Sequence, residues 1–309
     1  MPDIYPIGGG KGGIGKSFVA ANLGASIAKH GYQVVLVDLD LGASNLHTFL
    51  GIENPQSGIN SFLDKSVSQF ERLATPTSIS NLSFISSSHC SMEVSNLFYA
   101  QKLKIVRAVR TLPFDHVILD LGAGTNFNIL DFFLTSNDGI IICIPEPTSI
   151  ENAFRFIQAT YLRKIKRIIK RHAFSAAVKK AVFDPDSAGS YPLRARDVID
   201  VVLKEDPEKE QFLREKLSEF RFKIILNQYR KNLDPTLGQK IETVCNRHMY
   251  STFQFLGNIS YDERVAESVF SKKLYVQKYT STPTSVDLKK LAAAIIQNKA
   301  PASVLTQTA

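Results

Sequence analysis

Cysteine is scarce in this chain. Its 309 residues include only Cys90, Cys143 and Cys245, which lie far apart and form no C-x-x-C pair. This excludes a cysteine-based metal framework and is typical of a protein from a reducing compartment. Long apolar runs are missing too, since no stretch reaches the roughly 18 apolar residues that a membrane-spanning helix needs. The six histidines are scattered without metal-ligand spacing.

What the chain does have is a regular alternation of apolar runs and helical patterns. This alternation predicts an α/β fold, with a mostly parallel, twisted sheet and helices on both faces. Residues 1–299 read as a single domain, with a helical insertion at about 172–221 and a flexible tail at 300–309. Pro6 removes a donor from the first strand, which predicts a bulge there. The apolar runs lie near residues 4–7, 33–37, 82–86, 116–120, 139–144, 222–227 and 253–259.

The first apolar run leads into a glycine-rich loop. Residues 10–17 fit the pattern G-x-x-x-x-G-K-[ST], and a helical pattern follows them. Strand, glycine loop and helix together predict a phosphate-binding P-loop, whose backbone N–H groups point at one anion. In such a loop Lys16 reaches the β- and γ-phosphate oxygens and the Ser17 hydroxyl holds Mg²⁺. The candidate nucleotide-binding residues are Gly12, Gly13, Ile14, Gly15, Lys16, Ser17 and Phe18.

Two later apolar runs end in carboxylates. Residues 33–40 read Q-V-V-L-V-D-L-D and end in Asp38 and Asp40. Residues 116–124 read H-V-I-L-D-L-G-A-G, with Asp120 two residues before Gly122. Because the carboxyl ends of parallel strands open on the ligand crevice, we expect all three carboxylates at one site. A helix N-cap is the alternative role for Asp38 or Asp40.

Lys11 lies inside the loop, where an ordinary P-loop has no use for a cation. The pattern K-G-G-x-G-K-S resembles the deviant Walker A ATPases, a group that includes MinD, ParA and the flagellar regulators FlhG/FleN, and it is nearest to FlhG/FleN. The resemblance spans roughly residues 3–160 and 221–298. It implies a P-loop NTPase fold, ATP and Mg²⁺ as cofactors, and a homodimer that forms on ATP binding. In that group the early lysine reaches the partner's nucleotide, which implies this catalytic role for Lys11, beside Lys16.

The resemblance also implies roles for the carboxylates. By the D-x-D match, Asp40 would orient the attacking water, and Asp38 would act on the Mg²⁺ site through water. By the Walker B match, Asp120 would hold Mg²⁺ through water, and Gly122 would offer its N–H to the γ-phosphate. The metal-site residues are therefore Ser17, Asp38 and Asp120.

The identity of the base is readable at the end of the run 222–227. Guanine-binding proteins of this type carry N-K-x-D, whereas this chain has Asn227 followed by Gln228, with Arg230 in place of the aspartate. Guanine recognition is thus not expected. The resemblance implies that Asn227 faces adenine, and a turn-stabilising asparagine is the alternative.

Charge is unevenly distributed, because the net charge of +8 comes from the second half. Residues 155–180 hold nine basic residues and no acidic one. They predict an amphipathic covering helix with a solvated basic face, or a contact for nucleic-acid phosphates, an anionic membrane or an acidic protein. Near 284–298 the helical pattern is short and alanine-rich, which predicts packing on the sheet rather than lipid anchorage.

Together with the resemblance, these features predict a nucleotide-switched dimeric ATPase that positions a flagellum or a division site. It would work in the cytoplasm, or peripherally at the membrane or nucleoid, with a protein partner that stimulates hydrolysis. A ParA-like DNA-binding partitioning ATPase is the alternative. A metabolic or redox enzyme on the same fold is a third class, and the missing cysteine pairs argue against its iron–sulfur version.

Overall fold

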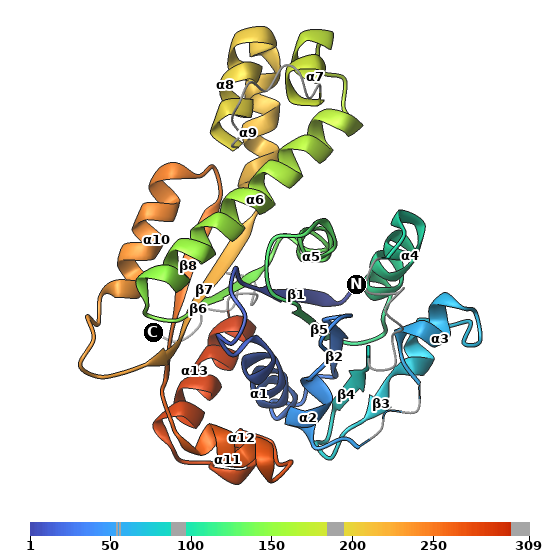
Figure 1. Cartoon of the computed structure of the whole chain (residues 1–309), viewed down its shortest axis with the longest axis vertical. Helices are drawn as coiled ribbons and strands as arrows, with labels where there is room; N and C mark the ends of the chain where they lie inside the picture. The colour runs from blue at the N-terminus through green and yellow to red at the C-terminus, as the bar shows by residue number, and fades with distance from the viewer. Residues whose placement is uncertain (54, 56, 88–96, 184–194, 298–309) are drawn as a thin grey trace, which may run out of the picture.

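An eight-stranded sheet forms the centre of the computed structural model, which describes residues 1–53, 55, 57–87, 97–183 and 195–297 (Figure 1). The strand order is β3-β4-β2-β5-β1-β6-β7-β8. Neighbouring strands pair in parallel except β3 with β4. This confirms the predicted mostly parallel sheet. The strands are β1 (Asp3–Gly8), β2 (Val34–Leu39), β3 (Thr75–Pro76), β4 (Leu82–Ile85), β5 (His116–Leu121), β6 (Ile140–Cys143), β7 (Arg221–Tyr229) and β8 (Thr252–Ser260).

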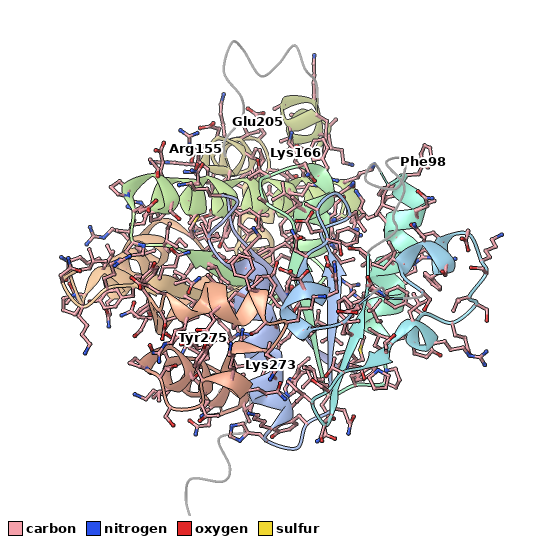
Figure 2. The ribbon with its side chains drawn as sticks, turned by 60° about the horizontal axis from the view of Figure 1, so that its bottom comes forward. Phe98, Arg155, Lys166, Glu205, Lys273 and Tyr275 are labelled. Carbon is pink, nitrogen blue, oxygen red and sulfur yellow. The ribbon has the colours of Figure 1, made fainter. Side chains whose placement is uncertain are left out.

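Helices cover both faces of the sheet. Figure 2 shows the two sides, with Arg155 and Lys166 near the top and Tyr275 towards the bottom. One face carries α1 (Lys16–Ala28), α2 (Leu46–Leu50), α11 (Arg264–Phe270), α12 (Tyr275–Lys278) and α13 (Pro283–Gln297). The other carries α3 (Ile59–Leu63), the 3₁₀ turn η1 (Phe70–Leu73), α4 (Tyr99–Arg110), α5 (Phe127–Phe133), α6 (Pro147–Arg171) and α10 (Leu237–His248).

The alternation of side chains along each strand divides the interior into two cores. Val35 and Val37 belong to the core under α4, α5 and α6, whereas Leu36 and Ile118 belong to the core under α1. Residues two apart on a strand point to the same face. The strands therefore place Asp38 and Asp120 on the α1 face, where the P-loop ends.

Four further elements lie between α6 and β7. They are α7 (Ala176–Phe183), α8 (Ala195–Glu205), the 3₁₀ turn η4 (Pro207–Lys209) and α9 (Glu210–Ser218), and they pack around the C-terminal part of α6, beyond the sheet (Figure 1). All of these elements lie within residues 172–221, the range that the sequence predicts to be helical. That these helices are an insertion stays a prediction, and the predicted tail at 300–309 lies outside the described residues.

Two local predictions have opposite outcomes. The bulge at Pro6 is wrong, because Pro6 pairs with Leu119 in unbroken register and the pairing with β6 begins only at Ile7. The packing of the last helix is confirmed, since Leu288 and Ile295 of α13 are buried in the core shared with α1. No helix in the described part of the chain is long and apolar enough to cross a bilayer.

Candidate nucleotide-binding site

The loop between β1 and α1 is built on glycines that other residues cannot replace. Gly13 and Gly15 have φ of 75° and 87°, in the left-handed region that favours glycine. Gly15 caps the N-terminus of α1. A Cβ on Gly10 would lie 2.1 Å from the backbone oxygen of Asn152 in α6. The loop thus has two left-handed glycines directly before the N-terminus of α1 and rests on α6, and a glycine loop at a helix N-terminus is the usual place for an anion-binding nest.

Lys16 points back into this loop. Its Nζ donates to the Lys11 carbonyl at 3.4 Å, and the residue is buried. Burial lowers the pKa of Lys16, and the charges of Asp120 and Asp40 oppose that shift. A buried ammonium group at a helix N-terminus is a strong site for phosphate oxygens.

Asp38 and Asp120 lie directly opposite each other on adjacent parallel strands. Both are buried. Asp38 accepts hydrogen bonds from the Asp40 N–H at 3.0 Å, the Ser44 hydroxyl at 2.7 Å and the Leu46 N–H at 3.3 Å. Burial raises its pKa despite these bonds. Burial and the charge of Asp38 raise the pKa of Asp120. A hydrogen bond to Ser17 and the charge of Lys16 partly offset this upward shift.

The Asp120 carboxylate has the features of a cation ligand. Within the described chain no hydrogen-bond partner reaches its buried Oδ1, although its carboxylate bonds to the Ser17 side chain. A buried carboxylate oxygen without a partner is costly, and a hard cation with oxygen ligands would satisfy it. The residues present therefore fit Mg²⁺ between Ser17 and Asp120, and Asp38 adds negative charge behind them.

Asp40 is held beside the segment that follows β5. Its Oδ1 accepts the Ala43 N–H at 3.1 Å. A Cβ on Gly122 would lie 3.1 Å from this same Oδ1 and 3.2 Å from the carboxyl carbon. The close approach brings the segments that follow β2 and β5 into contact, at the edge of the sheet where the P-loop lies.

Three of the predicted site residues have contacts that the sequence did not indicate. Lys11 Nζ lies 3.5 Å from Glu146 Oε2 of its own chain, and both side chains are largely exposed. Phe18 is buried, with its ring centroid 5.6 Å from that of Tyr275, so its side chain packs in the core and its contact with a nucleotide stays a prediction. Asn227 is buried, and its Nδ2 donates to the Ile14 carbonyl at 2.8 Å. Contact of Asn227 with a base stays a prediction.

Part of the positive charge of the basic segment 155–180 is neutralised by ion pairs inside the fold. Asp131 of α5 is buried and forms ion pairs with Lys102 of α4 and with Arg163 and Arg167 of α6. Burial alone would raise the pKa of Asp131, but the bonds from Arg163 and Lys102 and the charge of Arg167 hold it below its usual range. These two arginines thus join helices, and the solvated basic face is narrower than the pattern indicated.

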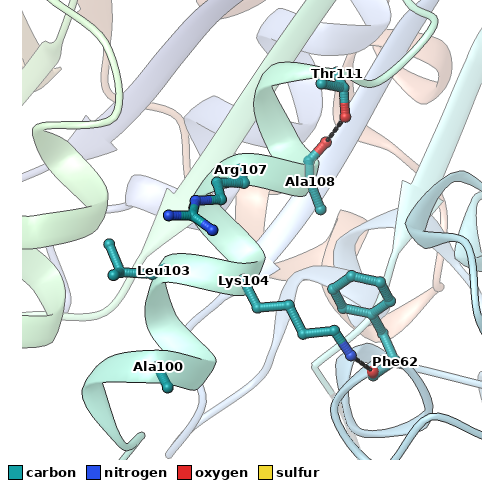
Figure 3. Close-up of a pocket in the computed structure, with 7 residues that line it drawn as sticks. All are labelled: Phe62, Ala100, Leu103, Lys104, Arg107, Ala108 and Thr111. Carbon is teal, nitrogen blue, oxygen red and sulfur yellow. Dashed lines mark hydrogen bonds between the residues drawn. The ribbon is translucent and has the colours of Figure 1, made fainter.

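Sequence reasoning missed Ser44, Glu146 and Asn152. Ser44 lies six residues after Asp38, within the motif segment, and Glu146 follows the end of β6 at the same sheet edge as the P-loop. The rule that carboxyl ends of parallel strands converge was the signal that could have found Glu146. Asn152 contributes a backbone oxygen, which no residue pattern reveals. The pocket in Figure 3, between α3 and α4, is separate, since none of its lining residues comes from the motif segments.

Solved structures share this fold over almost the whole chain. The cell division ATPase MinD of Pyrococcus furiosus has a TM-score of 0.66 at 19% identity, covering 96% of this chain and 100% of that one. MinD of Pyrococcus horikoshii, solved with Mg-ADP, has a TM-score of 0.64 at 17% identity, covering 96% of both chains. A ParA family ATPase of Chlorobium tepidum gives 0.63 at 16% identity, with 95% and 99% covered.

Sequence comparison points to the same group. The septum site-determining protein MinD of Helicobacter pylori is 30% identical over 158 residues, which cover 51% of this chain and 58% of that protein. The chain thus spans a little over half the length of such curated relatives. The profile described as "CobQ/CobB/MinD/ParA nucleotide binding domain" matches residues 6–275. This chain therefore belongs to the CobQ/CobB/MinD/ParA family of nucleotide-binding domains.

Proposed function

We propose that this chain is a MinD-type ATPase that binds ATP with Mg²⁺, hydrolyses it slowly, and dimerises according to its nucleotide state. The observation that carries the proposal is the buried Asp120 carboxylate, which bonds to Ser17 and has an oxygen left without a donor. Family membership and the fold of the Mg-ADP complex of a MinD support the choice of ligand.

In this mechanism the amides of the P-loop and the Lys16 ammonium bind the phosphate oxygens. Ser17 and Asp120 would hold Mg²⁺, which would supply positive charge to the nucleotide phosphates. Asp40 orients the attacking water and accepts its proton or hydrogen bond. The Gly122 N–H, close to Asp40, is placed to report whether a terminal phosphate is present.

Dimerisation is assigned to Lys11. In the single chain its side chain lies outward, beside Glu146, and an exposed pair of this kind contributes only about 0–1 kcal/mol. So weak a contact leaves Lys11 available for the nucleotide of a second copy, where it would stabilise charge in the transition state.

The test uses two variants and one control. Lys16→Ala should abolish nucleotide binding, whereas Lys29→Ala, at the other end of α1, should bind as the wild type does. Asp40→Ala should bind ATP without hydrolysing it, and should elute as a dimer in size-exclusion chromatography with ATP but not with ADP. Wild-type hydrolysis by Asp40→Ala would remove that residue from its role. Wild-type protein that stays monomeric and unliganded at millimolar ATP and Mg²⁺ would overturn the proposal.

For the cellular role we propose spatial positioning of a division site or a flagellum. The similarity to MinD of Helicobacter pylori favours a division-site type, and the FlhG/FleN assignment rests on the sequence resemblance alone. We place the protein in the cytoplasm, or peripherally at the membrane or nucleoid. Partitioning on DNA is a weaker candidate, because Arg163 and Arg167 of the basic segment pair with Asp131.

A further inference from the structure

A groove runs along the sheet face opposite α1, with α5 between α4 and α6 (Figure 1). We call it the α4–α6 groove and define it by Leu103, Val106 and Arg107 of α4, Leu130 of α5, and Leu162 and Lys170 of α6. Helix α5 has only 7 residues, against 12 in α4 and 25 in α6. The short helix therefore leaves the flanks of its longer neighbours uncovered.

The walls of the α4–α6 groove are strongly basic. Lys102, Arg107 and Arg110 line it from α4, and Lys166 and Lys170 are among the cations that line it from α6. Among the described residues Asp131 is the one acidic lining residue, and it is already bound by three cations. The described lining of the groove therefore carries a large net positive charge.

Like charges crowd each other at the far end of this groove. Burial lowers the pKa of Lys164, and the charge of Glu219 opposes this shift. The positive charges of Arg167, Lys216 and Arg171 lower the pKa of Lys164 further. An anionic partner would relieve this repulsion. Opposite charge brought into such a concave site also speeds association.

The apolar part of the groove distinguishes between anionic partners. Leu103 and Val106 of α4 and Leu162 of α6 are only partly buried, and Leu130 lies between them on α5. Figure 3 shows Leu103 and Arg107 on the side of α4 turned away from Phe62, so one face of α4 carries both an apolar and a basic residue. Nucleic-acid phosphates and a flat bilayer surface would meet the cations but not this floor.

A single nucleic-acid strand would need aromatic faces on which bases stack. Three exposed tyrosine and phenylalanine rings line the described groove: Tyr99, Phe127 and Phe183. The guanidinium of Arg163 lies over Phe127 at 4.6 Å and the ammonium of Lys102 lies 5.9 Å from the Tyr99 ring. One face of each of these two rings is therefore already covered, and Phe183 at the far end offers a single ring rather than a series on which bases could stack. An acidic amphipathic helix fits both the apolar floor and the basic walls of the groove. Its apolar stripe would contact the leucines, and its carboxylates would pair with the cations on either side.

We propose that the α4–α6 groove binds an acidic amphipathic helix of a partner protein, which completes the helical layer above α5. Its residues come partly from the elements beyond the sheet, since Phe183 of α7 and Lys216 of α9 line the far end. The near end is lined by Thr125 and Phe127, directly after Gly122. A helix docked there would touch the segment that packs on Asp40. If Asp40 orients the attacking water, as the proposed function states, the groove is a place where a partner can regulate hydrolysis.

The test measures binding of a fluorescein-labelled synthetic peptide with leucines at i, i+3, i+4 and i+7 and glutamates elsewhere. A scrambled peptide of equal composition is its control. Arg107→Glu with Lys170→Glu reverses one exposed charge on each wall, and should weaken peptide binding about tenfold or more. Lys29→Glu with Lys290→Glu makes the same change in net charge on other helices, and should leave binding within about twofold.

Three results would overturn the inference: equal weakening by both double variants, equal binding of the scrambled peptide, or a groove variant that loses duplex DNA or phosphatidylglycerol vesicles while keeping the peptide. Binding of a fluorescent ATP analogue is measured on the same samples. Protein that binds the peptide through the groove but ignores ATP refutes the proposed function alone. Protein that binds ATP without groove-dependent peptide binding refutes this inference alone. Equal peptide affinity with ADP and with a non-hydrolysable ATP analogue would refute the coupling to hydrolysis.

Discussion

Gly122→Ala tests the role of Asp40 without touching the carboxylate itself. The new Cβ would lie 3.1 Å from Asp40 Oδ1 and 3.2 Å from its carboxyl carbon, whereas ordinary contact begins at 3.4 Å. Gly122 is not among the glycines with positive φ, so alanine fits the backbone. The strain is relieved instead by a shift of the Asp40 side chain of a few tenths of an ångström.

The size of the effect follows from that shift. A displacement of about 1 Å at a reacting centre can cost about 100-fold in rate, so a third to a half of it should lower kcat by about 5- to 10-fold. This corresponds to about 1–1.4 kcal/mol of transition-state stabilisation. The KM for ATP should stay within about twofold, because the P-loop amides and Lys16 are unaltered.

The assay is steady-state phosphate release, with nucleotide binding measured in parallel. Gly42→Ala is the matched control, because no atom lies within 4 Å of its added Cβ and its φ is not positive. An unchanged kcat in Gly122→Ala would refute the reasoning, as would an equal loss in Gly42→Ala.

Three further predictions concern the ion pairs. Asp131→Asn should destabilise the protein by about 3 kcal/mol, the lower end for a broken buried pair, because Lys102 is buried while Arg163 and Arg167 are partly exposed. In thermal melts this loss corresponds to a fall in Tm of about 5 °C. The control Glu151→Gln, whose pair with Arg155 is exposed, should cost under about 1 kcal/mol. The pKa of Asp131 is lower in the folded protein than in the unfolded chain. The carboxylate therefore contributes stability above the unfolded pKa near 4, and this contribution is lost as the pH falls through the folded pKa. In urea titrations the free energy of unfolding of Asp131→Asn should fall less steeply below pH 4 than that of the wild type, and parallel pH profiles would contradict the assignment. Lys11→Ala should bind ATP as a monomer but fail to dimerise in size-exclusion chromatography, and an ATP-dependent dimer of this variant would exclude the crossing lysine.

Much of the fold was predictable because strands in a parallel sheet are buried on both faces and read as apolar runs. Seven strands were predicted from these runs. The exception is β3, whose two residues, Thr75–Pro76, form a short antiparallel edge strand. This strand is too short and too polar to show a hydrophobic periodicity in the sequence. Helix α7 has eight residues, and its pattern gave no separate signal.

The candidate site was predictable as far as strand ends, and not beyond. That Asp38 and Asp120 end neighbouring strands follows from the sheet order, in which β2 and β5 are adjacent although α2, α3, η1, β3, β4 and α4 lie between them in the chain. No local pattern contains this register. The same holds for Asp131, which lies 32 residues before its partner Arg163, so the charge pattern of α6 alone predicted a solvated face where an ion pair exists.

Because Asp38 and Asp120 face each other, the folding stability of the chain depends on its bound ligand. Burial raises the pKa of both carboxyl groups and costs stability in the protein without ligand, and a bound cation with its nucleotide would reduce that cost. Ligand at 100 times its Kd would add about 2.7 kcal/mol to the free energy of unfolding. A cell short of ATP would thus hold this chain in its most protease-sensitive form, and its abundance would follow the energy supply.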